Sequence, residues 1–230
     1  MKKPYIKKLV SKNGLNFFIV DGFWIRKNIE EEFTNCSDFH KFKFIPKNEV
    51  WIDKDNNAFE MKYFIKFYLA KEKYLSLGKH YKKAVKLANL IEKNERGKNI
   101  FLRKLKNVSN EQLINKIHKK LLRKYSNDKV KTWIVDGFLV RSLIFLDFTH
   151  GWHDFVYRFV PKNEVWIDDV ISSKDLKYVL VHELRERRLM KKGMKYNNAH
   201  YNFASKIELY LRKNPKKLDA ILRKEVEMQT

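Results

Sequence analysis

The sequence repeats itself at an offset of 115 residues, and this repeat constrains the fold more than any other feature. Residues 134–168 are identical to residues 19–53 at 18 of 35 positions, and the longest identical run is 46–53 against 161–168. Self-similarity of this length is typical of a duplicated structural unit. We therefore expect a tandem duplication, with one copy in residues 1–96 and a second in residues 127–230.

Within each copy, short β-rich runs come first and helices follow. In the second copy, apolar runs flank Asp136-Gly137, a dipeptide typical of a hairpin turn. Gly193 stands where a glycine often ends a helix. The expected helices of the second copy span residues 172–192, 197–213 and 214–228. The pattern predicts an α+β fold in which each small domain has short antiparallel strands followed by two or three helices.

The segment between the copies, residues 97–126, differs from both of them in charge. It carries nine Lys and Arg residues and a single acidic residue, Glu111. Residues 109–112 have the form of a helix-capping box, and apolar residues follow at helical spacing. We expect a basic amphipathic helix that joins the copies. Its exposed cations could contact a polyanion, and they are Lys119, Lys120, Arg123 and Lys124.

Composition excludes several classes of protein. No apolar run approaches the length needed to span a bilayer, and no apolar stretch follows the N-terminal lysines, so neither a membrane span nor a signal peptide is expected. Cys36 is the only cysteine, which excludes an intramolecular disulfide and favours a reducing, cytoplasmic setting. The net charge of +23 permits binding to nucleic acid.

The two copies differ in their candidate metal ligands. In the second copy, the first long helix contains His182, Glu183 and Glu186. The matching positions of the first copy hold Phe67, Tyr68 and Lys71. Residues present in both copies can be explained by folding alone, whereas residues confined to one copy suggest a function specific to it. The second copy is therefore the candidate functional domain.

The spacing of these residues suits a divalent metal. His182 and Glu186 are four residues apart, so they share one face of the helix. A third ligand must come from elsewhere: His200 on the following helix is one option, and His153 on an earlier loop is another. Glu208 is a further alternative, either as a ligand or as a hydrogen-bond partner of a ligand histidine.

The run from Val181 to Glu186 resembles the active-site helix of zincin metallopeptidases, whose motif is His-Glu-x-x-His. The resemblance implies that His182 and Glu186 bind the metal and that Glu183 is the general base. It also implies a peptide or amide substrate. This sequence departs from the motif because position 186 is Glu; a carboxylate ligand is compatible with zinc and also with Mn or Fe. The wider pattern is similar to a group of uncharacterised microbial and phage proteins.

Two functions from different classes follow from these observations. The first is a metal-dependent hydrolase, peptidase-like or amidase-like, whose site lies in the second copy and whose first copy is a degenerate partner. The alternative is a basic binding or structural protein without enzymatic activity, with nucleic acid as its partner. Bound metal would favour the first function, and binding to DNA or RNA that weakens steeply with salt would favour the second.

Overall fold

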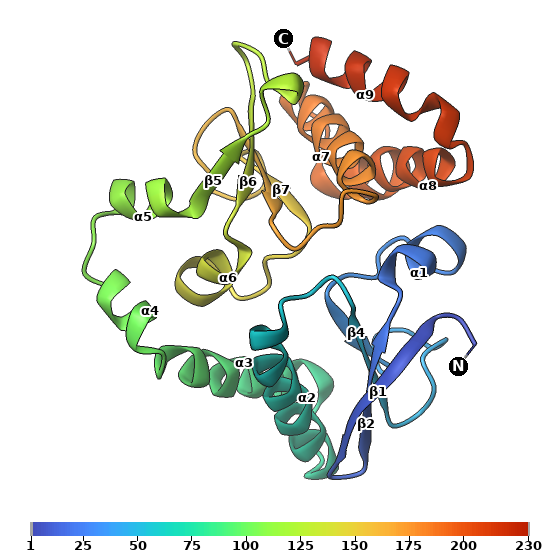
Figure 1. Ribbon diagram of the computed structural model, residues 1–230, viewed down its shortest axis with the longest axis vertical. Helices are drawn as coiled ribbons and strands as arrows, with labels where there is room; N and C mark the ends of the chain where they lie inside the picture. Colours follow the sequence, from blue (N-terminus) through green and yellow to red (C-terminus); the bar gives the residue numbers. More distant parts are fainter. Residues whose placement is uncertain (1, 230) are drawn as a thin grey trace. The chain divides into compact units, whose positions relative to one another are not determined.

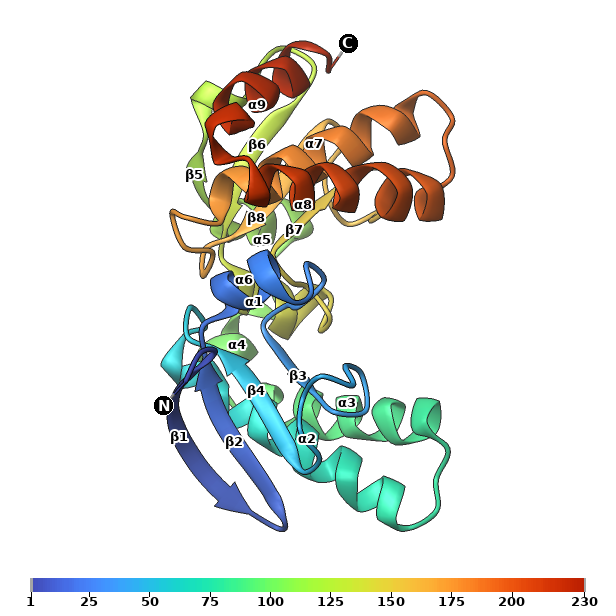
Figure 2. The ribbon, with the colours of Figure 1, turned by 90° about the vertical axis from the view of Figure 1, so that its right-hand side faces the viewer.

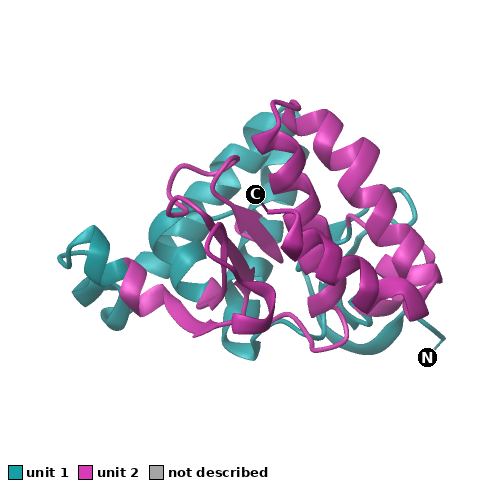
Figure 3. Ribbon diagram, turned by 90° about the horizontal axis from the view of Figure 1, so that it is seen from above, with its two compact units in different colours: residues 1–22, 33–113, 138–147 teal, residues 23–32, 114–137, 148–230 magenta. Residues whose placement is uncertain are grey.

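The computed structural model describes residues 2–229 of the chain. These residues form two compact units. Unit 1 consists of residues up to Gly22, Phe33–Leu113 and Phe138–Asp147, and unit 2 consists of Phe23–Glu32, Ile114–Gly137 and the residues from Phe148 onward (Figure 3). The helices and strands of both units confirm the α+β class that the sequence predicts.

Each unit contains a short segment from the other half of the chain. Residues 23–32 belong to unit 2, and residues 138–147 belong to unit 1. These two segments are related by the same 115-residue offset as the sequence repeat, so the exchange is reciprocal. The unit boundaries therefore differ from the contiguous copies predicted at 1–96 and 127–230.

Unit 1 contains a four-stranded sheet and two long helices (Figure 1). The helices α2 and α3 follow the sheet in the chain and pack against each other. The elements of this half of the chain are β1 (Tyr5–Lys12), β2 (Leu15–Val20), α1 (Gly22–Asn28), β3 (Cys36–Asp38), β4 (Glu49–Asp53), η1 (Ala58–Glu60), α2 (Met61–Ser76), α3 (Tyr81–Gly97) and α4 (Ile100–Leu105).

Unit 2 contains a second four-stranded sheet, and the helices α7, α8 and α9 follow it in the chain (Figure 2). The helix α7 packs on two strands of this sheet and on the helices that follow it. The elements of this half are α5 (Asn110–Ile117), β5 (His118–Leu121), η2 (Arg123–Tyr125), β6 (Lys131–Val135), α6 (Gly137–Leu139), η3 (Val140–Ile144), β7 (Gly151–His153), β8 (Glu164–Asp168), α7 (Leu176–Lys191), η4 (Asn198–Ala204), α8 (Ser205–Lys213), η5 (Pro215–Lys217) and α9 (Leu218–Glu227).

The two sheets have the same strand order and the same mixture of directions. The orders are β1-β2-β4-β3 and β5-β6-β8-β7. In each sheet the two central strands are parallel, and the outer strands pair antiparallel to them. The prediction of antiparallel strands is therefore correct for the outer pairs and wrong for the central pair.

The Asp-Gly dipeptides do not form the predicted hairpin turns. In both repeats the residues after Asp-Gly are helical, in α1 and α6. The glycine serves close packing, because a Cβ on Gly22 would lie 1.8 Å from a carboxylate oxygen of Asp53. A Cβ on Gly137 would lie 2.0 Å from Asp168 in the same way. The glycine lets the chain leave one strand beside the carboxylate that ends the neighbouring strand.

The basic segment between the repeats does not form the single helix that was predicted. It contains α4 and α5, and then the edge strand β5, which pairs antiparallel with β6. The capping box is confirmed, since the Ser109 and Gln112 side chains each accept a hydrogen bond from the other's backbone N–H. The helix ends at Ile117, which is buried, because the next residues satisfy their backbone groups in the sheet.

The core of unit 2 fixes the orientation of α7. Apolar residues of this helix, among them Leu180, Val181 and Leu184, pack with Val165 and Ile167 of β8. Gly193 ends this structure as predicted, with a φ of +90°. Buried polar residues on the same helix therefore have fixed positions, and these include the candidate ligands.

Candidate metal centre

Three elements of unit 2 bring the predicted site residues together. The helix α7 carries His182, Glu183 and Glu186, all of which are buried. His153 ends strand β7, and His200 lies in the π-helical segment η4. Both α7·β7 and α7·η4 are packed pairs of elements. Of the residues that the sequence suggested as ligands, His182 and Glu186 therefore lie on α7, and His153 and His200 lie on elements packed against it.

Three side-chain atoms converge on one point. His182 Nε2 lies 3.0 Å from His200 Nδ1, and His200 Nδ1 lies 2.6 Å from Glu186 Oε2. The third side of the triangle, His182 Nε2 to Glu186 Oε2, measures 3.5 Å. Two imidazole nitrogens and one carboxylate oxygen form a donor set that suits zinc, and also Mn or Fe. The residues present fit a divalent cation.

A carboxylate holds His182 from its outer side. His182 Nδ1 lies 2.9 Å from Glu208 Oε2, so it donates its proton to that carboxylate. Two nitrogens of Arg212 donate to the other oxygen of Glu208, at 2.7 and 3.0 Å. With Nδ1 engaged in this way, the ring presents Nε2 to the triangle. Glu208 therefore occupies the position of a hydrogen-bond partner of a ligand histidine, one of the two roles that the sequence suggested for it.

Both ring nitrogens of His153 are engaged in hydrogen bonds, so neither has a lone pair available to a cation. The backbone N–H of Phe155 donates to His153 Nδ1 at 3.3 Å, so Nδ1 carries no proton. Its Nε2 then carries the proton and donates to Glu186 Oε1 at 2.9 Å. His153, Glu183 and Glu186 also form a compact trio. The tautomer argues against this trio as the metal site, because the Nε2 lone pair of His153 is not available.

A fourth acidic residue of the site, Glu32, could not be identified from the sequence. Its Oε2 lies 3.3 Å from His200 Nε2, and Ser205 Oγ donates to its Oε1 at 2.8 Å. Glu32 belongs to the segment of the first repeat that forms part of unit 2. A comparison of the repeats does not single it out, because the matching residue, Asp147, is also acidic.

Glu183 lies beside the triangle. Its side chain is buried, yet its carboxyl group makes no hydrogen bond within the described residues. One of its oxygens lies within 4.8 Å of a Glu186 oxygen. The absence of a side chain at Gly151 makes room for it, since a Cβ there would lie 2.8 Å from Glu183 Cγ.

The electrostatics of the cluster shift several pKa values strongly. Burial raises the pKa of Glu183 to about 8, and the nearby Glu186 acts in the same direction. Burial alone would lower the pKa of His200, but its hydrogen bonds to Glu186 and Glu32 raise it to about 9. The pKa of His182 is likewise raised against the effect of burial by Glu186 and Glu208. In the metal-free chain, two protonated rings would therefore face each other with nitrogens 3.0 Å apart. A divalent cation would remove this repulsion by displacing one proton from each ring.

His200 lies at the start of a one-residue irregularity in its helix. Before it, Ala199 matches Ala84 at an offset of 115, and after it, Ala204 matches Ala88 at an offset of 116. The extra residue is accommodated by the π-helical turns of η4. Such π-bulges frequently occur at functional sites, because they redirect a side chain without ending the helix.

The equivalent place in unit 1 holds a lysine ammonium. Lys71, at the position matching Glu186, pairs with Asp38, at the position matching His153, with a distance of 2.5 Å. The Lys71 ammonium also lies over the rings of Tyr68 and Tyr81, at 4.5 and 5.6 Å. Both Lys71 and Asp38 are buried. Unit 1 thus places a covalently attached cation where unit 2 gathers ligand atoms.

The cations proposed for nucleic-acid binding lie on strand β5 and in the short 3₁₀ helix η2, and not on the predicted amphipathic helix. Lys119 is engaged by Asp136 and Asp169 of its own unit. The other three, Lys120, Arg123 and Lys124, are exposed. The Lys124 ammonium lies over the ring of Tyr125, at 5.8 Å from its centroid, and nucleic-acid binding by these four cations stays a prediction.

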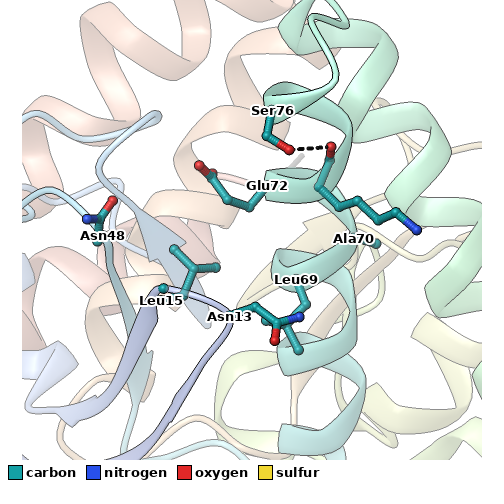
Figure 4. A pocket seen from close by; sticks show the side chains of 9 residues that line it. Asn13, Leu15, Asn48, Leu69, Ala70, Glu72 and Ser76 are labelled. Carbon is teal, nitrogen blue, oxygen red and sulfur yellow. Dashed lines mark hydrogen bonds between the residues drawn. The ribbon is translucent and has the colours of Figure 1, made fainter.

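A groove in unit 1 is separate from these residues. It encloses about 560 Å³ between the β1–β2 turn and helix α2, and its lining includes Asn13, Asn48, Glu72 and Ser76 (Figure 4). None of its lining residues is a candidate ligand.

No protein-family model, no curated protein and no solved structure matches this chain, so the site is interpreted from its own geometry. Among residues 2–229, no helix has the combination of length and apolar composition needed to cross a membrane.

Proposed function

We propose that the protein is a metal-dependent hydrolase that cleaves a peptide or other amide bond in a cytoplasmic setting. One observation carries this proposal: three ligand atoms of His182, Glu186 and His200 converge, and each of these residues is held from behind by a separate hydrogen bond. Solvated ion pairs on a helix surface have no reason to be arranged in this way. The amide substrate follows from the resemblance to zincins.

A divalent cation held by these residues would supply Lewis acidity, which polarises a substrate carbonyl and lowers the pKa of an adjacent water molecule. The chain's own contribution to proton transfer is Glu183. Within residues 2–229 its carboxyl group makes no hydrogen bond. Burial raises its pKa to about 8 in the metal-free chain, and a cation beside it would lower this pKa towards neutral pH, so that the carboxylate form could accept the proton. A general base works best when its pKa is near the working pH. Glu183 is therefore the proton acceptor in this proposal.

The proposal is tested by separating metal binding from proton transfer. The full chain, loaded with zinc, is incubated with a mixture of peptides, and cleavage is followed by mass spectrometry. Glu183→Gln should retain the metal and lower the rate by about 10²- to 10⁴-fold. The control is Tyr68→Phe, at the matching position of the first repeat, which should change neither quantity.

The proposal fails if the wild-type chain binds no divalent metal. It also fails as a hydrolase if the chain binds metal, cleaves nothing, and unfolds when the metal is removed. In that case the cation would only connect the helices of unit 2. If no metal binds and the chain binds DNA or RNA with a steep salt dependence, the alternative of a nucleic-acid-binding protein is supported.

A further inference from the structure

We propose that Glu32, a residue of the first repeat, completes the metal centre of the second repeat by fixing which nitrogen of His200 faces the cation. This inference rests on the proposed metal site and adds a residue to it. Glu32 acts as a positioning residue, because its carboxylate contacts the outer nitrogen of His200 and not the atoms that converge on the cation.

The segment that carries Glu32 is anchored in unit 2 by a buried ion pair. Arg26, which is almost fully buried, lies 2.6 Å from Asp175, and Arg212 lies 2.6 Å from the other oxygen of Asp175. Arg212 in turn holds Glu208, the partner of His182. The exchanged segment is therefore linked through this chain of contacts to one ligand and through Glu32 directly to another.

Unit 1 contains the same set of buried ion pairs. These pairs therefore belong to the scaffold that the two units share, and not to the candidate site. Arg141 of its exchanged segment pairs with Glu60 at 2.5 Å. Arg96 bridges Glu60 and Glu92, at 2.8 Å from each. These four residues of unit 1 take the places that Arg26, Asp175, Arg212 and Glu208 take in unit 2. The anchor is thus present with or without candidate ligands, and its role is to hold the exchanged segment.

The contact made by Glu32 has no equivalent in unit 1. The matching residue, Asp147, is exposed, and no hydrogen bond within the described residues engages it. Glu32 receives hydrogen bonds from both Ser205 and His200. The position matching His200 in the first repeat holds Val85. The carboxylate is therefore engaged only in the unit that contains the imidazole cluster.

The chemistry of this contact is specific to a metal ligand. An imidazole can bind a cation through either nitrogen, and the nitrogen that carries the proton is set by the hydrogen bond that it makes. With Nε2–H donating to Glu32, the lone pair of Nδ1 is left facing His182 Nε2 and Glu186 Oε2. Loss of such a partner typically weakens metal binding by about 10- to 100-fold.

It follows that the second repeat does not contain its whole centre. The carboxylate that orients one ligand comes from residues 23–32, which are more than 100 positions earlier in the sequence than the ligands. The reciprocal exchange therefore makes the first repeat a contributor to the site, which is more than the degenerate scaffold that its missing ligands suggest.

The test measures zinc affinity of the full-length chain by calorimetric titration. Glu32→Ala should weaken binding about 10- to 100-fold. Glu32→Gln should restore most of the affinity, because an amide oxygen still accepts the hydrogen bond from Nε2. The matched control is Asp147→Ala, at the equivalent position of the other exchanged segment, which should bind zinc as the wild type does.

A second readout reports the tautomer directly and distinguishes positioning from general destabilisation. In zinc-loaded protein with ¹⁵N-labelled histidine, His200 should show a slowly exchanging Nε2–H proton. That signal should be lost in Glu32→Ala and retained in Glu32→Gln and Asp147→Ala.

Two results would overturn the inference while leaving the proposed metal site intact. One is a wild-type zinc affinity in Glu32→Ala with the Nε2–H signal unchanged. The other is an affinity in Glu32→Gln as low as that of Glu32→Ala, which would mean that the carboxylate itself binds the cation. If the wild-type chain binds no zinc, the proposed function fails first, and this result is distinct from both.

Discussion

At the scale of single residues, the candidate site depends on the hydrogen-bond partner of each proposed ligand. His182 is held by Glu208, Glu186 by His153, and His200 by Glu32. Glu186, the proposed ligand that departs from the zincin motif, accepts a hydrogen bond from His153 through one oxygen and leaves the other available to the proposed cation. This arrangement gives His153 a reason to be buried that does not require it to bind metal.

The protonation of these residues predicts how the metal-free protein responds to pH. The pKa of His200 is raised from 6.5 to about 9, so its proton stabilises the fold fully below about pH 6.5, and this contribution is lost as the pH rises through 9. The pKa of Glu183 is raised from 4.5 to about 8, so stability falls between these pH values, because the unfolded chain loses this proton while the buried carboxyl keeps it. Burial lowers the pKa of His150 from 6.5 to about 3, which offsets that fall below about pH 6.5. Denaturant unfolding of metal-free protein should show stability falling between pH 6.5 and 9.

Zinc affinity should change with pH in the opposite direction. Zinc displaces a proton from each of the two rings, His182 and His200, so binding should tighten by up to about a hundredfold for each pH unit between 6.5 and 9. Titrations in buffers of different ionisation enthalpy would measure the protons released. Affinity that does not vary over this interval, with no proton release, would contradict the assignment of His200 as a ligand.

At the scale of elements, the π-helical turns of η4 are what distinguish the ligand-bearing helix from its counterpart α3. Unit 1 has the same buried Glu–Arg pair one residue earlier in register, as Glu92 and Arg96. The extra residue in η4 lets α8 keep that pair while His200 faces α7. The π-helical turns thus allow an imidazole at this position in a helix that otherwise keeps the buried ion pair of α3.

Removal of the extra residue should therefore remove the ligand. Deletion of Tyr201 should restore a regular α-helix, which turns His200 by about 100° relative to Glu208. The expected result is loss of zinc binding by the deletion variant, with far-UV circular dichroism unchanged. The matched control is deletion of exposed Lys192 in the loop after α7, which should preserve binding. Retention of zinc in the Tyr201 deletion variant would show that η4 does not set the position of His200.

At the scale of the whole molecule, the two units share their sheet topology and a buried arginine contact, and they differ in the side chains at one equivalent place. Their sheets have the same strand order, and both receive an exchanged segment through a buried arginine. One unit then places Lys71 and Asp38 where the other places Glu186 and His153. Folding requirements alone explain the shared features, so the function is expected in the features that differ.

The matched arginines provide a test at this scale. Arg26→Met and Arg141→Met each leave a buried carboxylate without one of its cations, and each should destabilise its unit by about 3–5 kcal/mol. Only Arg26→Met should weaken zinc binding, because its segment carries Glu32. Unfolding curves and zinc titrations of both variants measure the two effects. Equal loss of zinc affinity in both variants would contradict the division into scaffold and site.

The sequence predicted which side chains of the second copy lie close together, and it predicted less of the path of the chain. His182, Glu183 and Glu186 could be identified because a helix places residues four apart on one face. The parallel central strands were missed because Asp-Gly between apolar runs is typical of a hairpin, whereas here the glycine packs against Asp53 or Asp168. Glu32 was missed because an exchange of segments leaves no local pattern. The change of offset from 115 to 116 across His200 was visible in the sequence and could have indicated the π-bulge.

The most direct measurement of the central claim is the position of a bound metal in crystals of the full-length protein. With zinc added, anomalous scattering at the zinc edge should show one peak in contact with His182 Nε2, Glu186 Oε2 and His200 Nδ1. The peak should disappear in His200→Ala and persist in Glu183→Gln. A peak on His153 and Glu183, or no peak in unit 2 at stoichiometric zinc, would contradict the account.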